Sequence, residues 1–438
     1  MPQRRRVLQR ALSIGIALSI LAVLPSAARS FLPTELPLRN DGLALGPSGE
    51  QTVVPPRSGQ RFVDGTSVLT GTPDAAEAVA ESRAWLAEGP VPGRGTEYED
   101  MAEQALLDLR ALVGEDGAVM AAPITIWRYT WPRDSAFVVA ALSVTQHHDD
   151  AATVLDYLSG IAPEEGWWEA RYRPDGEPAG YGNRPPQLDG SGWVPWAVWA
   201  WWETHPDTQR AGEALDRYAP MVIDSADTAA EAIGPDGLPP PSSDYWERVE
   251  TEVTLGTVGP LRAGLRAAVQ LAPELDVGPQ RAQRWQDALD RLETGIDQHF
   301  APHGYPRTVP DGGADSAIAF LAPPFGPADD DVRVALVEAE RALQVRAGGV
   351  RPGEDWTKDV GVAWTPSTSS MALAAATTGE LALAHQLLGF LDAHRTGLGS
   401  LPEKIDSRGM PSSVVPLGWT SAAVLLTLVA LEGELPSV

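Results

Sequence analysis

Residues 127–134 read Trp127-Arg128-Tyr129-Thr130-Trp131-Pro132-Arg133-Asp134, and the apolar segment 135–144 follows directly. Alternation along an extended chain places the three aromatic side chains on one side. Asp134 is well placed to cap the helix that we expect to follow. Two interpretations are open. The segment is either a buried aromatic plug with a capped helix, or a polyol site where rings pack on a sugar and Arg133 and Asp134 bind its hydroxyls.

Helical segments alternate with long loops throughout the chain after residue 95. Apolar periodicity predicts about twelve helices and few strands, at 97–113, 134–146, 149–161, 189–203, 207–233, 253–271, 279–299, 314–321, 331–345, 362–378, 379–394 and 418–431. This pattern suits an α-solenoid or an all-α (α/α)6 toroid, which is a closed double ring of helices. The toroid is favoured because several connections are too long for a solenoid, and a ring would gather such loops at one mouth.

The composition excludes several classes of function. The 438 residues carry a formal charge of −26 and contain no cysteine. An acidic surface repels phosphates, so we expect no nucleic-acid partner. The lack of cysteine excludes disulfides and thiolate metal sites. The run His147-His148-Asp149-Asp150 is expected to be a polar cap at a helix junction, not a metal site, because adjacent histidines point to different faces.

The N-terminal region predicts export. Residues 1–28 combine a basic start with a short apolar run, which is typical of a signal peptide or an N-terminal anchor. Residues 29–92 are rich in Pro and Gly and predict an arm or linker, with a short strand pair near 51–69. Residues 93–438 would form the helical domain. We expect a secreted or extracytoplasmic monomer, with no membrane contact beyond the possible anchor.

A second cluster follows at Gly182-Asn183-Arg184-Pro185-Pro186-Gln187-Leu188-Asp189-Gly190, before a helix rich in tryptophan. Trp196 and Trp199 lie at positions i and i+3, which favours a place in the core over a ligand platform. Gln187 and Asp189 are better ligand candidates, because they stand at the helix entrance. A helix cap is the alternative for Asp189.

Two loops rich in proline or glycine each carry a candidate catalytic carboxylate. In Asp244-Tyr245-Trp246-Glu247, burial of Glu247 against Trp246 would favour its protonated form, as a general acid needs. In Pro402-Glu403-Lys404, the neighbouring cation would favour the ionised form that a general base needs. The alternatives are a surface ion pair of Glu247 with Arg248 and a solvated charge run around Glu403.

Five segments in series resemble the family-15 glycoside hydrolases, the glucoamylase and glucodextranase family. They are Tyr129-Thr130-Trp131-Pro132-Arg133-Asp134, Gly182-Asn183 with Gln187-Leu188-Asp189, Asp244-Tyr245-Trp246-Glu247, Arg351 with Glu354-Asp355 and Trp364, and Pro402-Glu403 with Asp406 and Pro416-Leu417-Gly418-Trp419. The similarity runs from about residue 97 to residue 431. It implies an (α/α)6 barrel and an inverting, exo-acting hydrolase that needs no cofactor and releases a monosaccharide, with glucose expected, from an α-glucan or related oligosaccharide.

The resemblance also implies roles for single residues. Glu247 would protonate the glycosidic oxygen, and Glu403 would deprotonate the attacking water. Arg133, Asp134 and Arg351 would hold the sugar at the non-reducing end. The other substrate-binding candidates are Trp127, Trp131, Asn183, Gln187, Asp189, Asp244, Trp246, Trp364 and Trp419. An inverting pair of carboxyl groups lies ~6.5–9.5 Å apart, so the two loops would have to face each other.

Departures from the family pattern leave the substrate open. Arg248 stands where relatives usually have a second acid, and Lys404 stands where they usually have glutamine. Starch, isomalto-linkages, trehalose and a glycan without glucose are all possible substrates. Two other functions remain: a sugar-binding protein on the same scaffold that has lost turnover, and a phosphorolytic or lyase relative. A phosphorolytic enzyme would need a phosphate site in place of the base Glu403.

Overall fold

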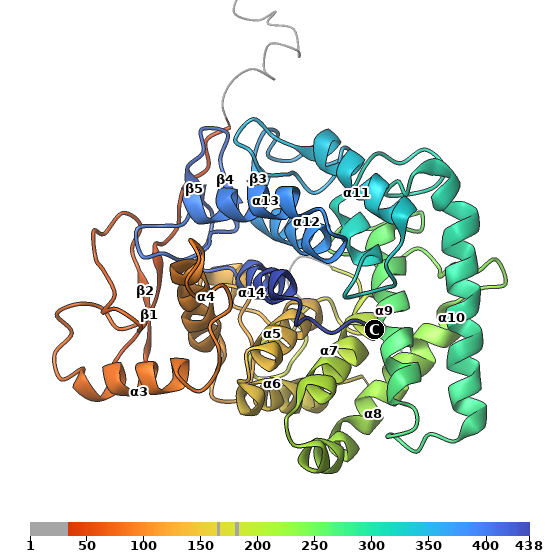
Figure 1. Ribbon diagram of the computed structural model, residues 1–438, viewed down its shortest axis with the longest axis horizontal. Coiled ribbons are helices and arrows are strands. Elements are labelled where there is room, and N and C mark those ends of the chain that lie inside the picture. The colour runs from red at the N-terminus through yellow and green to blue at the C-terminus, as the bar shows by residue number, and fades with distance from the viewer. Residues whose placement is uncertain (1–33, 164–166, 180–183) are drawn as a thin grey trace, which may run out of the picture.

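The computed structural model describes residues 34–163, 167–179 and 184–438, which form a mostly helical molecule (Figure 1). The segment 1–28, expected to be a signal peptide or anchor, lies outside the described residues, as does Asn183. Within the described residues, no helix combines the length and the apolar character that crossing a membrane requires.

An inner ring of helices forms the centre of the fold. Its members are α5 (Pro132–Val144), α7 (Gly190–Thr204), α9 (Leu255–Leu271), the 3-10 helix η3 (Ser316–Leu321), α12 (Thr365–Thr377) and α14 (Gly418–Glu432). Each helix packs against the next, and α14 returns to pack against α5, so the ring closes. Nearly every residue of α5, α7, α12 and α14 is buried, which explains why these segments carry few charged side chains.

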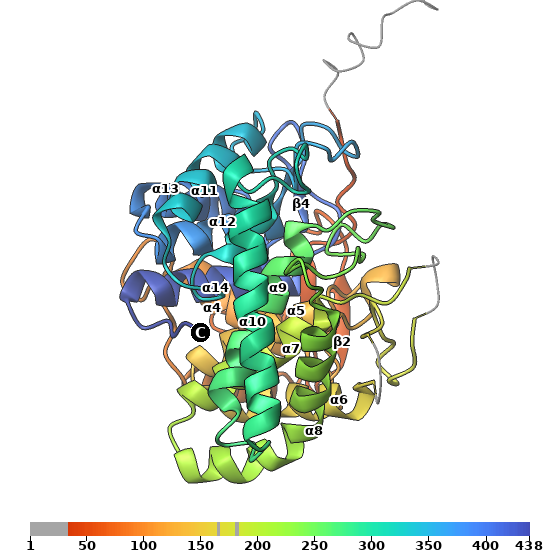
Figure 2. The same ribbon diagram turned by 90° about the vertical axis from the view of Figure 1, so that its right-hand side faces the viewer.

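An outer ring of amphipathic helices surrounds the inner one. It consists of α4 (Glu99–Leu112), α6 (His148–Ile161), α8 (Thr208–Ala232), α10 (Pro279–His299), α11 (Asp330–Leu343) and α13 (Leu381–Ala393). In Figure 1, α6, α8, α10 and α11 follow one another around the margin, and Figure 2 shows α10 on the outside. The expected (α/α)6 toroid is confirmed, and the solenoid is excluded by the closure of the ring.

Four helical elements differ from the sequence prediction. The helix expected at 314–321 is the short 3-10 helix η3. A helix that was not expected, α3 (Ala76–Leu86), lies within the segment 29–92 and packs against α4. Two further 3-10 turns, η1 (Thr125–Trp127) and η2 (Ala301–His303), lie in loops.

The strands are short and lie outside the helical rings. β1 (Gly42–Leu45) pairs antiparallel with β2 (Gln51–Val54), so the expected pair near 51–69 is shifted toward the N-terminus, and Phe62 and Leu69 form only an isolated bridge. β3 (Ala363–Trp364), β4 (Lys404–Ile405) and β5 (Pro411–Ser412) form a small sheet in the order β3-β4-β5. This sheet joins the start of α12 to the loop that carries Glu403.

The expected helix cap at Asp134 is wrong. α5 begins two residues earlier, at Pro132, and Trp131 is the N-cap residue without a side-chain cap bond. Proline is favoured at the first helical position, because its fixed φ suits the helix and its missing N–H would have no partner there. The carboxylate of Asp134 is therefore free for contacts with other side chains.

The histidine pair and the tryptophan-rich helix both have structural roles. His147 Nε2 lies 3.1 Å from the carbonyl of Trp85, and His148 Nε2 lies 3.0 Å from the carbonyl of Thr204, so the two rings do point to different faces. Trp196 and Trp199 are buried in the core, as expected. Trp196 contacts Phe325 with ring centroids 5.0 Å apart.

Candidate active site

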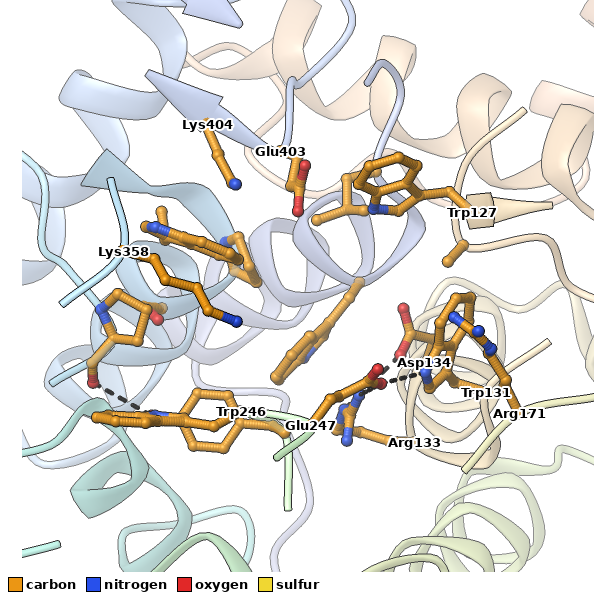
Figure 3. Close-up of a pocket in the computed structure, with 18 of the residues that line it drawn as sticks. Trp127, Trp131, Arg133, Asp134, Arg171, Trp246, Glu247, Lys358, Glu403 and Lys404 are labelled. Carbon is orange, nitrogen blue, oxygen red and sulfur yellow. Dashed lines mark hydrogen bonds and ion pairs between the residues drawn. The ribbon is translucent and has the colours of Figure 1, made fainter. Parts of the chain in front are cut away.

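Long loops meet at one mouth of the ring around a cavity of about 280 Å³ (Figure 3). They come from chain segments that are far apart in sequence, and they bring most of the residues selected from the sequence together. Those that line the cavity are Trp127, Trp131, Arg133, Asp134, Trp246, Glu247, Trp364, Glu403 and Trp419. The cavity therefore combines aromatic faces with carboxylates and cations, as a polyol site requires.

Glu247 has an unusual backbone conformation. Its φ is 53°, in the left-handed region that a residue with a side chain rarely adopts. Its N–H donates to the Asp244 carbonyl at 2.7 Å, which closes a tight turn. The turn directs the carboxylate into the cavity, where Oε1 accepts a hydrogen bond from Trp131 Nε1. Strain of this kind is found at functional sites, where surrounding contacts hold it.

Two guanidinium groups also lie at Glu247. Arg184 forms an ion pair with Oε2, and Arg133 Nη2 lies 3.6 Å from Oε1. The side chain of Glu247 is only 11% exposed, so these contacts are partly shielded from water. The alternative of a surface pair with Arg248 does not hold, because Arg248 Nε pairs with Glu250 at 2.7 Å.

A buried arginine supports the loop that carries Glu247. Arg307 Nη2 lies 2.8 Å from Asp244 Oδ2 and 2.7 Å from Glu250 Oε1, and Nη1 lies 3.1 Å from Asp315 Oδ2. Its guanidinium carbon also lies 3.7 Å from the ring centroid of Trp246. Arg307 thus ties both ends of the 244–250 turn to the start of η3.

Arg133 is held between two acids. Its Nη1 lies 3.0 Å from Asp189 Oδ2, and its Nε lies 3.7 Å from Asp134 Oδ2. Burial raises the pKa of Asp134 and that of Asp189 to about 6 each, and Arg133 opposes the rise in both. Asp189 is the N-cap residue of α7, but its side chain makes no cap hydrogen bond. Its carboxylate pairs with Arg133 instead.

Glu403 lies immediately before β4, on the opposite side of the cavity from Glu247 (Figure 3). Its Oε2 accepts a hydrogen bond from Ser413 Oγ, and its carbonyl accepts one from Thr365 N at 3.0 Å. It is 6% exposed. The solvated charge run that we considered as an alternative is therefore excluded for Glu403.

Lys404, expected to act on Glu403, has other contacts. Its Nζ lies 2.8 Å from Asp359 Oδ2 and 4.0 Å from the ring centroid of Trp364. It nevertheless lines the same cavity as Glu403. The ammonium is held within the cavity wall by an acid and an aromatic face.

Four of the selected residues, Gln187, Asp189, Asp244 and Arg351, lie behind or beside the cavity wall. Gln187 Nε2 donates to the Asp244 carbonyl at 3.2 Å, and Asp244 is fully buried against Arg307. Arg351 is half-buried and is not among the residues that line the cavity.

Other residues that line the cavity do not stand out in the sequence as site residues. Among them are Arg171, Arg184, Tyr245, Trp356, Lys358, Asp359 and Ser367. One signal was available for Lys358. It and Lys404 are the only lysines in a sequence that otherwise uses arginine.

Comparison with known proteins supports the fold. No family model matches the chain. An uncharacterised glycosyl hydrolase of Methanocaldococcus jannaschii is 23% identical over 348 residues, which are 74% of this chain. The chain spans about half of that relative's length, 54%.

Solved structures with the same fold include two proteins named for sugar hydrolysis. A variant glycosidase in complex with glucose superposes with a TM-score of 0.66 at 21% identity, over 77% of this chain and 97% of that one. A bacterial glucoamylase complexed with acarbose gives a TM-score of 0.67 at 17% identity, over 82% of this chain and 59% of that one. The chain therefore has the helical-toroid fold of these glycosidases and glucoamylases.

Proposed function

We propose that this protein is an exported glycoside hydrolase that acts with inversion on the non-reducing end of an oligosaccharide or polysaccharide and releases a monosaccharide, with glucose as the first candidate. One observation carries the proposal. Glu247 and Glu403 lie on separate loops and face one aromatic-lined cavity from opposite sides (Figure 3). Inverting hydrolysis needs two carboxyl groups arranged in this way, with room for water between them.

Glu247 is the general acid in this proposal. It gives its proton to the glycosidic oxygen as the bond from that oxygen to the anomeric carbon breaks. Trp131 Nε1 and Arg133 hold the carboxylate that remains. Arg184 pairs with the carboxylate of Glu247, so this ion pair has to open when the glycosidic oxygen approaches.

Glu403 is the general base. It takes a proton from water, whose oxygen bonds to the anomeric carbon on the face opposite the leaving group. Ser413 Oγ donates to Oε2 of Glu403, which fixes the carboxylate and leaves Oε1 for the water. Lys404 and Asp359 form an adjacent ion pair that contributes to the wall around this water.

The exo-acting mode is supported by the polar and aromatic residues in the wall of the cavity. Arg133, Asp134 and Trp419 line it, with the Arg133 guanidinium 5.0 Å from the ring centroid of Trp419. A chain end that enters this cavity finds donors, acceptors and a ring face at its terminal sugar. Export is proposed from the residues 1–28 alone.

A panel of glycans tests the proposal. The mature protein is incubated with α-linked glucans, isomalto-oligosaccharides, trehalose and acidic oligosaccharides, with and without phosphate, and NMR follows the anomer that appears first. We expect an α-linked substrate to release a β-sugar without any need for phosphate. Retention of configuration would contradict inversion. Release that depends on phosphate would identify a phosphorolytic enzyme, and binding without release would identify a sugar-binding protein.

A further inference from the structure

The cavity wall is rich in cations, in contrast to the chain as a whole. The formal charge of the chain is −26, yet the five cations that line the cavity (Arg133, Arg171, Arg184, Lys358 and Lys404) outnumber its four carboxylates (Asp134, Glu247, Asp359 and Glu403). Cations that crowd one cavity repel one another, so this arrangement has a free-energy cost. A substrate that carries a negative charge would offset that cost.

The guanidinium groups on one side lie close enough to affect one another. Burial, together with the nearby Arg171 and Arg133, lowers the pKa of Arg184 to about 10. Arg171 lies 4.8 Å from the ring centroid of Tyr129 and 5.4 Å from that of Trp131, so the rings support its guanidinium.

The two lysines occupy the wall on the side of Glu403. Figure 3 shows both ammonium groups directed into the cavity, Lys358 from the loop 346–361 and Lys404 from β4. Lys404 is neutralised by Asp359. Within the part of the chain that the structure describes, Lys358 pairs with no carboxylate, and its Nζ lies 5.5 Å from the ring centroid of Trp356.

From this arrangement we infer that the sugar unit bound between Glu247 and Glu403 carries an anionic substituent, such as a uronic-acid carboxylate or a sulfate or phosphate ester, and that Lys358 binds that substituent. The inference rests on the proposed function and specifies its substrate class. A compact ammonium is suited to pair with a carboxylate or ester oxygen, while Trp356 and Trp364 offer ring faces for the C–H groups of the sugar. The presence of both lysines of the chain at this one cavity, in a sequence otherwise rich in arginine, agrees with such a role.

Monosaccharide binding tests the inference without depending on hydrolysis. Calorimetry on the wild-type chain compares each neutral sugar with its acidic partner: glucose with glucuronate, galactose with galacturonate, and mannose with mannuronate. Glucose 6-sulfate and glucose 6-phosphate form a separate arm that distinguishes esters from carboxylates. We expect at least one acidic sugar to bind about tenfold more tightly than its neutral partner at low salt, and less so as salt rises.

Three variants assign the effect to Lys358. Lys358→Gln should lose the preference for the acidic sugar, and Lys358→Arg should retain part of it. Arg217→Gln is the matched control, because it removes an exposed cation that pairs with Asp156 at 2.8 Å outside the cavity. The inference is overturned if no acidic sugar binds more tightly than its neutral partner in any pair, or if the preference survives in Lys358→Gln.

The two proposals can fail separately. If the wild-type chain hydrolyses neutral glycans and shows no preference for acidic sugars, the proposed function stands and the anionic substrate is wrong. If acidic sugars bind in a manner that depends on Lys358 but no glycan of the panel is hydrolysed, the binding inference stands and the hydrolase proposal is wrong.

Discussion

Glu247 shows how one residue can combine backbone strain with chemistry. A side chain at a φ of 53° costs roughly 1–2 kcal/mol relative to ordinary helical or extended backbone. The surrounding contacts offset this cost, because the Glu247 N–H donates to Asp244 and the carboxylate accepts from Trp131. The direction of the carboxylate therefore depends on the turn as much as on the side chain itself.

Replacing either carboxylate by its amide tests the two catalytic roles at the residue scale. Glu247→Gln and Glu403→Gln should each lower kcat by about 10²–10⁴-fold, the usual contribution of a positioned acid or base. Calorimetry with the released monosaccharide should show that binding is largely unchanged, because the amide keeps the size of the side chain. Near wild-type turnover in either variant on the true substrate would contradict the role of that residue.

The loop that carries Glu247 depends on Arg307 at the scale of the element. Arg307 is 2% exposed and contacts carboxylates of Asp244, Glu250 and Asp315. Arg307→Gln should lower the free energy of unfolding by about 3–5 kcal/mol, since it leaves buried acids without their cation. Urea unfolding measures this loss.

A milder variant separates positioning from folding. Arg307→Lys keeps the charge but loses the forked geometry, so it should remain folded and lower kcat by about tenfold as Glu247 shifts. Arg217→Lys, at an exposed ion pair, serves as the control. An unchanged kcat in folded Arg307→Lys would show that Arg307 does not position the acid.

The loop that carries Glu403 is held by the N-terminal arm. Asn40 is fully buried, and its amide both donates to the Val415 carbonyl and accepts from the Val415 N–H at 3.0 Å. Arg39 N donates to the Ser413 carbonyl at 2.8 Å, and Ser413 in turn holds Glu403. The arm thus reaches the proposed base through one intervening serine.

Asn40→Ala should weaken this connection. Loss of both bonds leaves buried backbone groups of Val415 without partners, which costs about 1–3 kcal/mol of unfolding free energy for each group. We expect kcat to fall more than KM changes, because the displaced group is the base and not the sugar-binding wall. Gln51→Ala removes a comparable amide bond from the same arm, to the Ala111 carbonyl at 2.8 Å, and should leave kcat unchanged. Equal effects of the two variants would contradict a specific role for Asn40.

At the scale of the whole molecule, periodicity predicted the helices, and the long connections between them favoured a ring over a solenoid. The inner and outer helices match the apolar pattern, because each inner segment is buried on all sides and each outer one on a single face. The helix α3 was missed because it is short and lies within a segment rich in Pro and Gly. The 3-10 helix η3 has six residues, too few for periodicity to distinguish it from an α-helix.

The site was predictable where its residues form local motifs and not where they meet only in space. Trp131, Glu247 and Glu403 stand in recognisable segments, and each lines the cavity. Arg307 and Asn40 do not belong to any recognisable motif. Arg307 contacts Asp244, 63 positions away, and Asn40 contacts Val415, 375 positions away. Such contacts depend on ring closure, which no local pattern encodes.

Asp108 links ring closure to the pH dependence of stability. This fully buried residue of α4 accepts hydrogen bonds from Gln104 Nε2 at 2.9 Å and from Ser400 Oγ at 3.0 Å, so it joins the outer ring to the loop 395–417. Burial raises its pKa from 3.8 to about 7. Between these two values the folded chain binds a proton that the unfolded chain has released, so stability falls as pH rises through this window.

Asp108→Asn should remove this part of the pH dependence, because the amide resembles the protonated acid at every pH. Near pH 3 the variant and the wild type should have similar free energies of unfolding. As pH rises toward 7, the variant should become the more stable of the two, and above pH 7 the difference should stay constant. The gain should be on the order of 1–4 kcal/mol. Burial also raises the pKa values of Asp134 and Asp189, so these two residues also make stability fall as pH rises. They do so equally in the variant and the wild type. The difference between the two plots of stability against pH therefore reports Asp108 alone. Urea unfolding of both proteins across this pH range measures it. A difference that does not change with pH would mean that Asp108 ionises alike in the folded and unfolded chains.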